Sequence, residues 1–386
     1  MGMTVLLVGS ALALLAWLGV LVAPHQPHRV RERLEADAAA PDDLTAVTVL
    51  IPARDEAASI GRAIAALGVQ GRELDVVVVD DESSDDTRVA AARAAGPDLA
   101  LRIVEGRPLP EGWAGKLWAL EQGLAMVDRP YVLLLDADIE LKPRLLPALL
   151  AKMRERDATL VSLLAELNCE TFWERLLCPA FVFFFKLLYP FAWSNDAAKA
   201  TAAAAGGCML VRADALRLIG GFAAIRGALI DDCTLAAALK RHRSPIWLGM
   251  THSVRSLRVY ASLGDFWNMV ARSAFTQLRY STVWLLAATV LMTVTLLVPP
   301  LGLAAGLATA EPRVALMAGA AWLALAAAYW PVASFYRLPL AWTATLPVAA
   351  ALFLAMTLSS ALRYWRGTRA RWKARDYRRA PERARR

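Results

Sequence analysis

Short apolar runs alternate with amphipathic segments through the middle of the chain. Runs rich in Val, Leu and Ile, which predict buried strands, lie at 46–52, 74–81, 99–105 and 131–138. Apolar residues at helical spacing predict helices at 58–67, 83–95 and 115–127, with Ser59 as a cap of the first. Such alternation is typical of a parallel α/β sheet with right-handed crossovers.

Longer uncharged segments flank this region. Residues 3–23 carry no charge and are long enough to cross a bilayer, for which about 20 apolar residues suffice. Three further apolar segments follow the central region, at 283–309, 314–333 and 341–362. This layout predicts an anchor, a water-soluble domain and then a membrane bundle.

The first apolar segment is either a retained anchor or a cleaved signal peptide. No basic residue precedes it, as one would in a signal peptide, whereas Arg29, Arg31 and Arg33 follow it. Positive charge after a span favours a cytoplasmic flank. We therefore expect a multi-pass protein of the cytoplasmic (inner) membrane with four parts: an anchor at 1–25, a cytoplasmic domain at 45–280, a membrane region at 281–362 and a basic tail at 363–386.

Composition supports the membrane assignment and separates the tail from the rest. Hydrophobic residues make up 57% of the chain and the mean hydropathy is +0.40, which is high for a soluble enzyme. The tail holds eleven Lys or Arg and two Asp or Glu, so it carries +9 and leaves −1 for the remainder of a chain whose total is +8. We expect the tail to contact anionic lipid headgroups. We expect no nucleic-acid partner, because no aromatic and basic binding module accompanies the charge.

The tail raises a conflict in membrane topology. Three full spans after a cytoplasmic domain would carry the tail outside, against the positive-inside tendency. Either the tendency fails here, or one segment is re-entrant or interfacial. The segment with Val298, Pro299 and Pro300 is the candidate, because proline interrupts helical hydrogen bonding.

Charged residues stand where three of the predicted strands end. Arg-Asp-Glu at 54–56 follows the first strand, Asp80 and Asp81 end the second, and Asp136 and Asp138 end the fourth. In a parallel sheet these ends meet at one edge, where ligands bind. Two carboxylates as close as Asp136 and Asp138 repel unless a cation lies between them, and Mg²⁺ or Mn²⁺ prefers oxygen ligands shared with substrate phosphates. The pattern predicts a metal–diphosphate site; a plain turn with a capping aspartate is the alternative.

A series of segments, in order, resembles the family 2 glycosyltransferases. IPARDEAASI resembles their first strand and turn, VVVVDDESSDDT their nucleotide-binding strand, GKLWALEQG their Gly-Lys helix and LLLDAD their DxD motif. GCMLVRADALRLIGGF and IDDCTLAAAL are similar to their acceptor-side segments, and TQLRY to a weakened Q-x-x-R-W motif. The likeness covers about residues 46–280. The anchor, GWAGKLWAL and the C-terminal spans most resemble members associated with hopanoid biosynthesis.

This resemblance implies a GT-A fold, Rossmann-like with a mostly parallel sheet, and transfer of a sugar with inversion from a nucleoside diphosphate sugar, expected to be a UDP-sugar. Mg²⁺ or Mn²⁺ would bind Asp136 and Asp138 and stabilise the leaving diphosphate. The implied nucleotide-sugar site consists of Pro52, Ala53, Arg54, Glu56, Asp80, Asp81, Lys116, Asp136, Ala137, Gln277 and Arg279. In it Lys116 adds a cation near the phosphates, unless it lies on a solvated helix face. Asp81, with Asp80 behind it, bonds the base or ribose, unless one of the two merely caps a helix.

Inversion requires a base that takes the proton of the acceptor. The resemblance gives this role to Asp232, with Asp231 as its replacement; Asp231 stands where the family usually has Glu. Alternatively, both are helix N-terminal charges favoured by the macrodipole. Thr276 and Tyr280 replace the Gln and Trp of the family motif beside Gln277 and Arg279, which favours a single transfer over chain extension.

Aromatic and apolar residues gather at 170–193 and 264–275, segments suited to a membrane interface. A buried core helix is the alternative for the first. Together with the spans they predict a lipid acceptor, such as a hopanoid, a polyprenyl phosphate or a glycerolipid. Two other functions stay open. A nucleotidyltransferase needs a Gly-rich basic loop where IPARDEAAS is acidic, and a non-catalytic membrane scaffold would not need the intact DxD, Lys116 and Asp232.

Overall fold

The computed structural model describes residues 2–367, 371–372 and 375–376 of the 386-residue chain. The chain forms two compact units. Of the described residues, the sheet unit comprises 32–168, 193–259, 371–372 and 375–376, and the helical unit comprises 2–31, 169–192 and 260–367. Residues 169–192 and 260–280 therefore group with the apolar helices, although the sequence suggested a soluble domain continuous over 45–280.

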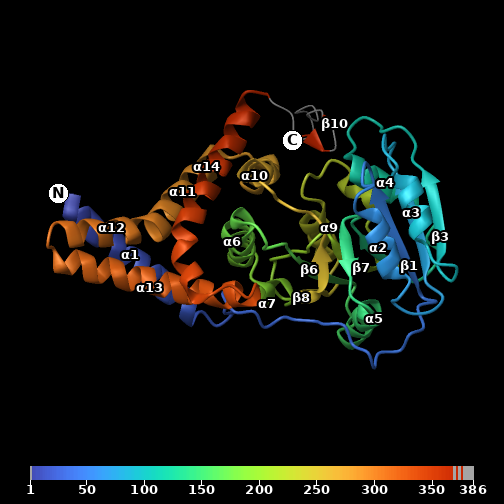
Figure 1. Ribbon diagram of the computed structural model, residues 1–386, viewed down its shortest axis with the longest axis horizontal. Helices are drawn as coiled ribbons and strands as arrows, with labels where there is room; N and C mark the ends of the chain where they lie inside the picture. The colour runs from blue at the N-terminus through green and yellow to red at the C-terminus, as the bar shows by residue number, and fades with distance from the viewer. Residues whose placement is uncertain (1, 368–370, 373–374, 377–386) are drawn as a thin grey trace. The chain divides into compact units, whose positions relative to one another are not determined.

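An eight-stranded sheet among the described residues forms the centre of the sheet unit (Figure 1). The order of its strands is β3-β2-β1-β4-β7-β6-β8-β5. Its strands are β1 (Val47–Ala53), β2 (Asp75–Asp80), β3 (Ala100–Glu105), β4 (Tyr131–Leu135), β5 (Ile139–Leu141), β6 (Leu160–Glu166), β7 (Cys208–Arg212) and β8 (Ile246–Ser256). The neighbours β3, β2, β1 and β4 are parallel, as predicted. Strand β7 is antiparallel to β4 and β6, and β8 is parallel to β6 and antiparallel to β5.

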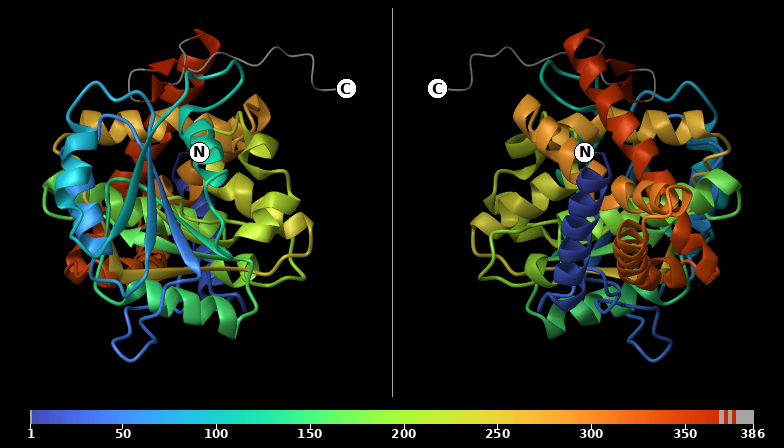
Figure 2. Two further views of the ribbon diagram at one scale, coloured as in Figure 1. Left: turned by 90° about the vertical axis from the view of Figure 1, so that its right-hand side faces the viewer. Right: turned by 90° about the vertical axis from the view of Figure 1, so that its left-hand side faces the viewer.

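Helices cover both faces of this sheet (Figure 2, left). One core contains Val49 and Ile51 of β1 with α2 (Ile60–Leu67), α3 (Thr87–Ala94) and α5 (Leu145–Glu155). The other contains Leu50 of β1 with α4 (Gly115–Leu124), α8 (Ala213–Leu218), the 3₁₀ turn η1 (Gly221–Ile225) and α9 (Asp231–Arg241). Successive residues of a strand point to opposite faces, so a continuous apolar run buries β1 on both sides. A short helix, α7 (Phe191–Ser194), lies between α6 and β7 in the chain.

Two helices begin later than the sequence predicts, because polar side chains before each helix make other hydrogen bonds. Ser59 precedes α2, but its hydroxyl donates to the carboxylate of Glu56 (3.0 Å) and makes no capping bond. Helix α3 begins at Thr87 and not near 83. Residues 83–86 are engaged elsewhere: the Ser83 hydroxyl accepts from the Asp55 N–H (3.0 Å), and Asp85 accepts from the Thr87 N–H (3.0 Å). The loops after β1 and β2 are thus bonded to each other at the edge where both strands end.

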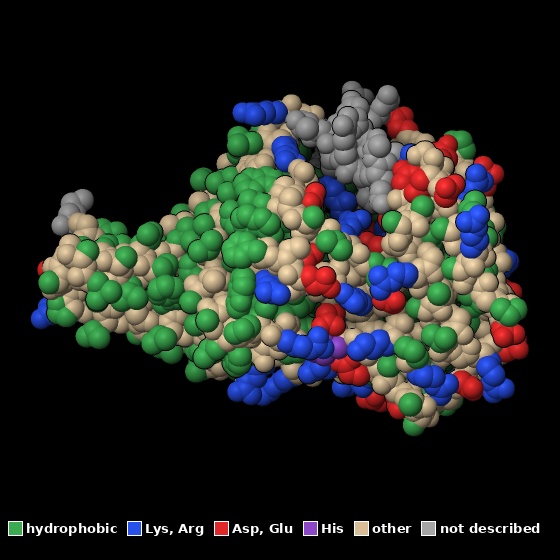
Figure 3. All heavy atoms as spheres, in the orientation of Figure 1, with side chains coloured by type: hydrophobic (Ala, Val, Ile, Leu, Met, Phe, Trp, Pro, Cys, Tyr) green, Lys and Arg blue, Asp and Glu red, His purple; other side chains and the backbone are tan. Residues whose placement is uncertain are grey.

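The helical unit contains four helices that are long and apolar enough to cross a membrane among the described residues. They are Gly2–Val22, Thr282–Ala308, Pro312–Phe335 and Leu340–Trp365. Their elements are α1 (Gly2–Val22), α11 (Thr282–Met292), η2 (Thr293–Leu297), α12 (Val298–Ala308), α13 (Pro312–Phe335), η3 (Leu340–Thr345) and α14 (Leu346–Trp365). Hydrophobic side chains cover the visible surface of α1, α12 and α13 (Figure 3). This pattern suits lipid-facing helices and fits the predicted anchor and bundle.

The Pro299–Pro300 pair does not end the helix that contains it. A π-helical turn, η2, precedes it, and the two prolines stand in the first turn of α12, where a missing N–H costs least. The indole N–H of Trp17 in α1 donates to the Thr295 carbonyl within the π turn (2.7 Å). On α12, a Cβ on Gly302 would lie 2.9 Å from the Ser10 hydroxyl, and one on Gly306 would lie 2.6 Å from the backbone nitrogen of Ala315. The helices therefore pack closely through small residues.

The remaining helices of this unit are α6 (Phe172–Leu188) and α10 (Leu263–Gln277), the two segments predicted to lie at a membrane interface. A capping box of Thr171 and Glu174 starts α6. Helix α6 packs against α13 and α14, and its Glu174 and Lys186 are buried within the unit. Helix α10 packs against α14. Most of the basic tail lies outside the described residues, which include only β9 (Arg371–Trp372) and β10 (Arg375–Asp376) beyond 367.

In the second core, α4 approaches the sheet so closely at Gly123 that a larger residue there should destabilise the protein. A Cβ on Gly123 of α4 would lie 2.2 Å from Cδ1 of Leu50 and 3.0 Å from Cγ2 of Val79. We expect Gly123→Ala to lower the free energy of unfolding by roughly 1–3 kcal/mol, because overpacking displaces buried side chains. Gly96→Ala, which meets nothing within 4 Å, is the matched control. Equal unfolding midpoints for the two variants in detergent would contradict this packing.

Candidate active site

Asp136 and Asp138 follow directly on β4, at the edge where the parallel strands end. The Asp136 N–H donates to the Gly207 carbonyl (3.1 Å), and the Asp136 carbonyl accepts from the Ile139 N–H (3.1 Å). The Asp138 carbonyl accepts from the Leu257 N–H (2.7 Å). The backbone around both aspartates is therefore fixed by the segments before β7 and after β8.

Lys116, in the first turn of α4, joins two of the predicted catalytic segments. Its Nζ lies 2.7 Å from Oδ1 of Asp136 and 3.1 Å from Oδ2 of Asp231. Burial disfavours its charge, but the carboxylates of Asp136, Asp231 and Asp232 outweigh that effect and raise the pKa of Lys116 above its usual value. The alternative in which Lys116 lies on a solvated helix face is wrong.

Arg258, just beyond β8, pairs with the second aspartate of the DxD pattern. Its Nε lies 3.3 Å from Oδ2 of Asp138, a side chain that is 17% exposed. Arg258 is not among the predicted site residues, because no sequence motif marks it. The signal that was present is a basic residue shortly after a buried strand, IWLGMTHSVRS, but the edge at which that strand ends depends on its pairing with β6.

The site carries more negative than positive charge. It contains four carboxylates and two cations: Asp136, Asp138, Asp231, Asp232, Lys116 and Arg258. With every group ionised, four negative and two positive charges leave −2. Burial raises the pKa of Asp136; Lys116 opposes this effect, and Asp138 and Asp231 add to it. One divalent cation would bring the formal charge to zero.

The donor set suits a metal shared with a substrate. No group of three or more His, Cys, Asp or Glu side chains that could hold a metal occurs within the described part of the chain. Asp136 and Asp138 supply two carboxylates, and Mg²⁺ commonly binds one or two carboxylates together with waters and substrate phosphates. These residues therefore fit a hard divalent cation held jointly with a diphosphate, and they do not form a site closed by protein ligands.

Asp232 stands at the start of α9 with its carboxylate held by two backbone groups. Its Oδ2 accepts from the Gly206 N–H (2.9 Å) and its Oδ1 from the Cys233 N–H (2.7 Å). Burial and the neighbouring Asp231 nevertheless raise the pKa of Asp232 to about 6. A Cβ on Gly206 would lie 3.3 Å from Oδ2 of Asp232 and 3.4 Å from Nζ of Lys116, so a glycine allows this close approach.

The alternative roles of Asp231 and Asp232 at a helix N-terminus are partly realised. Both lie in the first turn of α9, where the macrodipole favours negative charge. The two carboxylates differ in their partners: Asp231 pairs with Lys116, whereas Asp232 is bonded by backbone N–H groups. Asp232 is therefore the one whose carboxylate is not neutralised by a direct cation contact in the described residues.

The loops after β1 and β2 bring the predicted nucleoside residues together. The Asp81 N–H donates to the Ala53 carbonyl (2.7 Å), and the Arg54 guanidinium donates to the Asp81 carbonyl. The Glu56 N–H donates to the hydroxyl of Thr87 (2.8 Å). The order Pro52–Ala53–Arg54 thus lies beside Asp80–Asp81, with Pro52 opposite Val79 and Ala53 opposite Asp80 in the parallel register.

Asp80 and Ala137 are placed by the backbone and are buried. Asp80 is 2% exposed; its Oδ2 lies 3.7 Å from Nε of Arg88, and its Oδ1 makes no hydrogen bond among the described residues. The N-cap position of α3 is Asp86, so neither Asp80 nor Asp81 occupies it. Ala137, between the two aspartates, is 3% exposed. A small residue therefore fills the turn between the DxD carboxylates.

Gln277 and Arg279 belong to the helical unit and have local structure there. Gln277 accepts from the hydroxyl of Tyr189 (3.1 Å), and Arg279 and Tyr280 both have left-handed φ angles, +53° and +56°. The Thr276 hydroxyl donates to the Tyr280 hydroxyl (3.0 Å). The structure defines the turn formed by TQLRY, and a role for Gln277 and Arg279 at the nucleotide stays a prediction.

Comparison with known proteins agrees with this picture. Residues 48–220 match the family described as Glycosyl transferase family 2. The mannosyltransferase from Pyrobaculum calidifontis, solved with GDP-Man and Mn²⁺, is similar over 94% of this chain and 97% of its own, with 20% identity and a TM-score of 0.53. Glucosyl-3-phosphoglycerate synthase from Mycobacterium tuberculosis, solved with phosphoglyceric acid, aligns over 64% of this chain and 86% of its own, with 18% identity and a TM-score of 0.43. The search of curated proteins found no match.

The sheet order, the helices on both its faces and the likeness over nearly the whole chain define a GT-A fold. The protein is a glycosyltransferase. More specifically, residues 48–220 are the part of the chain that matches the model described as Glycosyl transferase family 2. The nucleotidyltransferase and scaffold alternatives have no support from these comparisons.

The raised pKa of Asp232 predicts that this residue costs stability at neutral pH. A carboxyl whose pKa rises from 3.8 to about 6 on folding binds its proton more tightly in the native state. The stabilisation that comes from this tighter proton binding is therefore fully present below the unfolded pKa of 3.8. It is lost as the pH rises through the folded pKa of about 6. We expect Asp232→Asn to raise the free energy of unfolding by roughly 2 kcal/mol at pH 8, and by much less near pH 4.

Unfolding of the detergent-solubilised protein at the two pH values measures this difference. Asp231→Asn is the matched control and should destabilise the protein, because it removes the ion pair with Lys116. A destabilised Asp232→Asn variant at both pH values would show that its backbone hydrogen bonds outweigh the burial of its charge.

Proposed function

We propose that the protein is a membrane-bound inverting glycosyltransferase that moves a sugar from a nucleoside diphosphate sugar, expected to be a UDP-sugar, to a lipid acceptor. The observation that carries the proposal is the partly buried excess of carboxylates around Lys116, at the edge where β1, β2 and β4 end. A diphosphate with a divalent cation matches that arrangement, because the cation compensates the excess negative charge and Lys116 adds a further positive group.

In this proposal each group on the donor side has one task. A bound Mg²⁺ or Mn²⁺ would stabilise the charge that develops on the departing diphosphate. Asp136 and Asp138 would hold that ion, and Arg258 would keep the Asp138 carboxylate turned to the site. Lys116 lies against Asp136 and supplies a fixed positive charge near the phosphates.

The nucleoside would lie on the loops after β1 and β2. Asp81, with Asp80 behind it, would accept hydrogen bonds from the base or ribose. Pro52, Ala53, Arg54 and Glu56 would shape the pocket, largely through the backbone that the Asp81–Ala53 bond fixes. Ala137 would leave room for the sugar diphosphate between the two DxD carboxylates.

Asp232 is the proposed general base, with Asp231 as its replacement. A base is most effective when its pKa lies near the working pH, and the pKa of Asp232 is raised to about 6. At neutral pH it is ionised, yet it is a stronger base than an ordinary aspartate. Bonds from the Gly206 and Cys233 N–H groups fix its direction, as the transfer of a proton from a positioned hydroxyl requires.

The proposed acceptor is a lipid, either a hopanoid or a polyprenyl-type lipid. Four long apolar helices suggest membrane association, and α6 and α10 pack with them in one unit. Arg29, Arg31 and Arg33 follow α1, which supports a catalytic domain on the cytoplasmic side of the inner membrane. The basic tail would contact anionic headgroups there, and Gln277 and Arg279 would assist the donor or the acceptor.

The metal assignment predicts a variant that loses metal and nucleotide together. Asp138→Asn should abolish the Mn²⁺-dependent part of UDP binding and reduce transfer at least about 100-fold, because it removes a charged ligand. Isothermal titration with UDP, with and without Mn²⁺, measures the binding. Asp128→Asn, an exposed aspartate before β4, is the control and should bind as the wild type does. Unchanged Mn²⁺-dependent binding in Asp138→Asn would remove the assignment.

The assignment of Asp232 as the base predicts a variant that keeps metal and nucleotide binding but loses transfer. Asp232→Asn should bind UDP and Mn²⁺ nearly as the wild type does, yet lose transfer by a factor of about 100 or more. In the wild type, kcat/KM should fall as the pH drops below about 6, where Asp232 takes up its proton.

The assay incubates purified protein with labelled nucleotide sugars and total membrane lipid, and mass spectrometry identifies the product. A fully active variant would disprove the role of Asp232, and a water-soluble product would disprove the lipid acceptor.

A further inference from the structure

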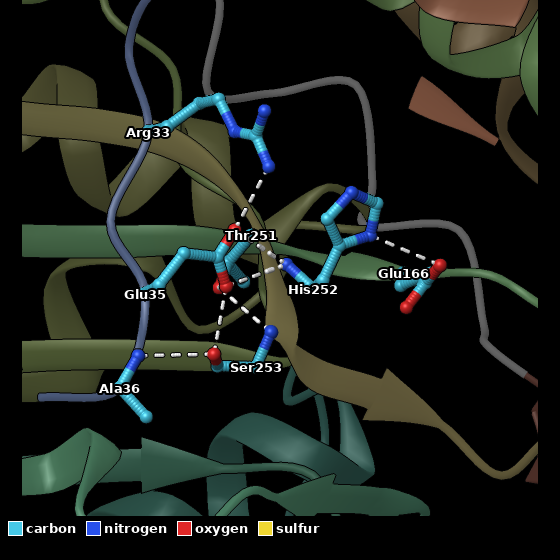
Figure 4. Close-up of polar contacts among 7 residues, drawn as sticks. All are labelled: Arg33, Glu35, Ala36, Glu166, Thr251, His252 and Ser253. Carbon is cyan, nitrogen blue, oxygen red and sulfur yellow. Dashed lines mark hydrogen bonds and ion pairs between the residues drawn. The ribbon is translucent and has the colours of Figure 1, made fainter. Parts of the chain in front are cut away.

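Glu35, in the segment that connects α1 to the sheet, is fully engaged with β8 and has no part in the site described above. Its Oε2 accepts from the hydroxyls of Thr251 (3.0 Å) and Ser253 (2.7 Å). Both carboxylate oxygens accept from the His252 N–H, at 3.1 and 3.0 Å. Figure 4 shows the carboxylate directed at these three consecutive residues, and its Oε1 also accepts from the Arg33 guanidinium (3.1 Å).

The hydrogen bonds keep this carboxylate ionised. Burial would raise the pKa of Glu35, but the bonds from Ser253, His252, Arg33 and Thr251 outweigh burial and hold the pKa below its usual value. A carboxylate with this many donors is a strong acceptor, since bonds to a charged group are worth about twice those between neutral groups. The contact is therefore a specific attachment of residues 32–36 to β8.

The attachment lies where β8 changes its edge partner. Residues 32–34 run beside the first part of β8: the Met250 N–H donates to the Glu32 carbonyl (2.8 Å), and the Leu34 N–H to the Met250 carbonyl (3.2 Å). Further along, β8 pairs with β5, with Val254 opposite Leu141 and Ser256 opposite Ile139. Glu35 is bonded to the three residues between these two pairings, so it fixes the place at which one partner ends and the other begins.

Ser253 connects the attachment to the strand that follows the DxD aspartates. Its hydroxyl donates to Glu35 and accepts from the Ala36 N–H (3.0 Å), while its carbonyl accepts from the Lys142 N–H (2.8 Å) at the end of β5. Strand β5 begins at the residue after Asp138. The continuation of β8 holds Asp138 from the other side, through the Leu257 N–H (2.7 Å) and the Arg258 guanidinium (3.3 Å).

We propose that Glu35 is a positioning residue for Asp138: by fixing residues 251–253 of β8, it sets the β5–β8 pairing that presents the Asp138 carboxylate to the metal nucleotide. The segment after the first apolar helix is then part of the catalytic apparatus and not a simple linker. The inference rests on the proposed metal role of Asp138. It differs from a purely structural role for Glu35, which would change stability without changing the dependence of nucleotide binding on metal.

The test compares Glu35→Gln with Glu32→Gln in the full-length protein. Both variants remove one carboxylate from the same segment, but the Glu32 contact with β8 is through its backbone carbonyl, which the substitution keeps. Glu35→Gln should weaken Mn²⁺-dependent UDP binding about tenfold, the lower end of the effect of residues that orient metal ligands. UDP binding without metal should be unchanged. Glu32→Gln should resemble the wild type in both measurements.

A second readout needs no metal or nucleotide. In metal-free protein, hydrogen–deuterium exchange at residues 139–142 should be faster in Glu35→Gln than in Glu32→Gln, because the Lys142 N–H bond to Ser253 loosens. Ser253→Ala, which removes the connecting hydroxyl and leaves the other donors to Glu35, should show the same two changes to a smaller degree. It also keeps the proposal testable if Glu35→Gln does not fold.

The outcomes separate this inference from the proposed function. If UDP binding by the wild type does not depend on Mn²⁺, the metal role fails, and the exchange experiment alone decides whether Glu35 orders β5. If the wild type does depend on Mn²⁺ but Glu35→Gln and Ser253→Ala bind like Glu32→Gln, the inference is overturned. Faster exchange without loss of metal-dependent binding also overturns it, because the attachment would then be structural only.

Discussion

The contact of Lys116 with Asp136 and Asp231 is the interaction on which the geometry of this site depends. It joins the end of β4 to the start of α9, two segments far apart in the sequence. The helix that carries Lys116 is itself tied to the chain before α9: the Ala114 N–H donates to the Arg226 carbonyl (2.7 Å), and Glu121 accepts from the Phe222 N–H (2.8 Å). Without the ammonium group, buried like charges would oppose the approach of the two segments.

One cation cannot balance the carboxylates that it brings together, and this imbalance explains several observations. The pKa values of Asp136 and Asp232 are raised, Lys116 holds its proton tightly, and Arg258 pairs with the remaining DxD carboxylate. A site built in this way costs folding stability and gains affinity for positive charge. Functional sites commonly show this exchange of stability for activity. In the proposed function, this exchange would tie binding of the donor to binding of a counter-ion.

The sequence predicted the parts of the molecule that local patterns determine. Buried runs such as 74–81 gave strands because an apolar run of that length has few alternatives, and the order of strand ends placed Asp81 and Asp136 at one edge. Arg258 was missed because its partner Asp138 is reached only through the pairing of β8 with β5 and β6. The attachment of Glu35 was missed for the same reason. Hydrophobic periodicity and composition report on residues that are neighbours along the chain. They do not show contacts such as these, which join segments distant in the sequence.

The π-helical turn at Thr293–Leu297 has a consequence for how the membrane helices fit together. Each residue of a helix turns the next by about 100°, so the extra residue of a π turn rotates everything beyond it relative to an unbroken α-helix. Gly302 and Gly306, which follow the π turn, lie against Ser10 and Ala315. A sequence one residue shorter in this turn would form a more regular helix and would direct its glycines away from their partners. The π turn before the two prolines thus sets the rotation of α12 about the helix axis relative to α11.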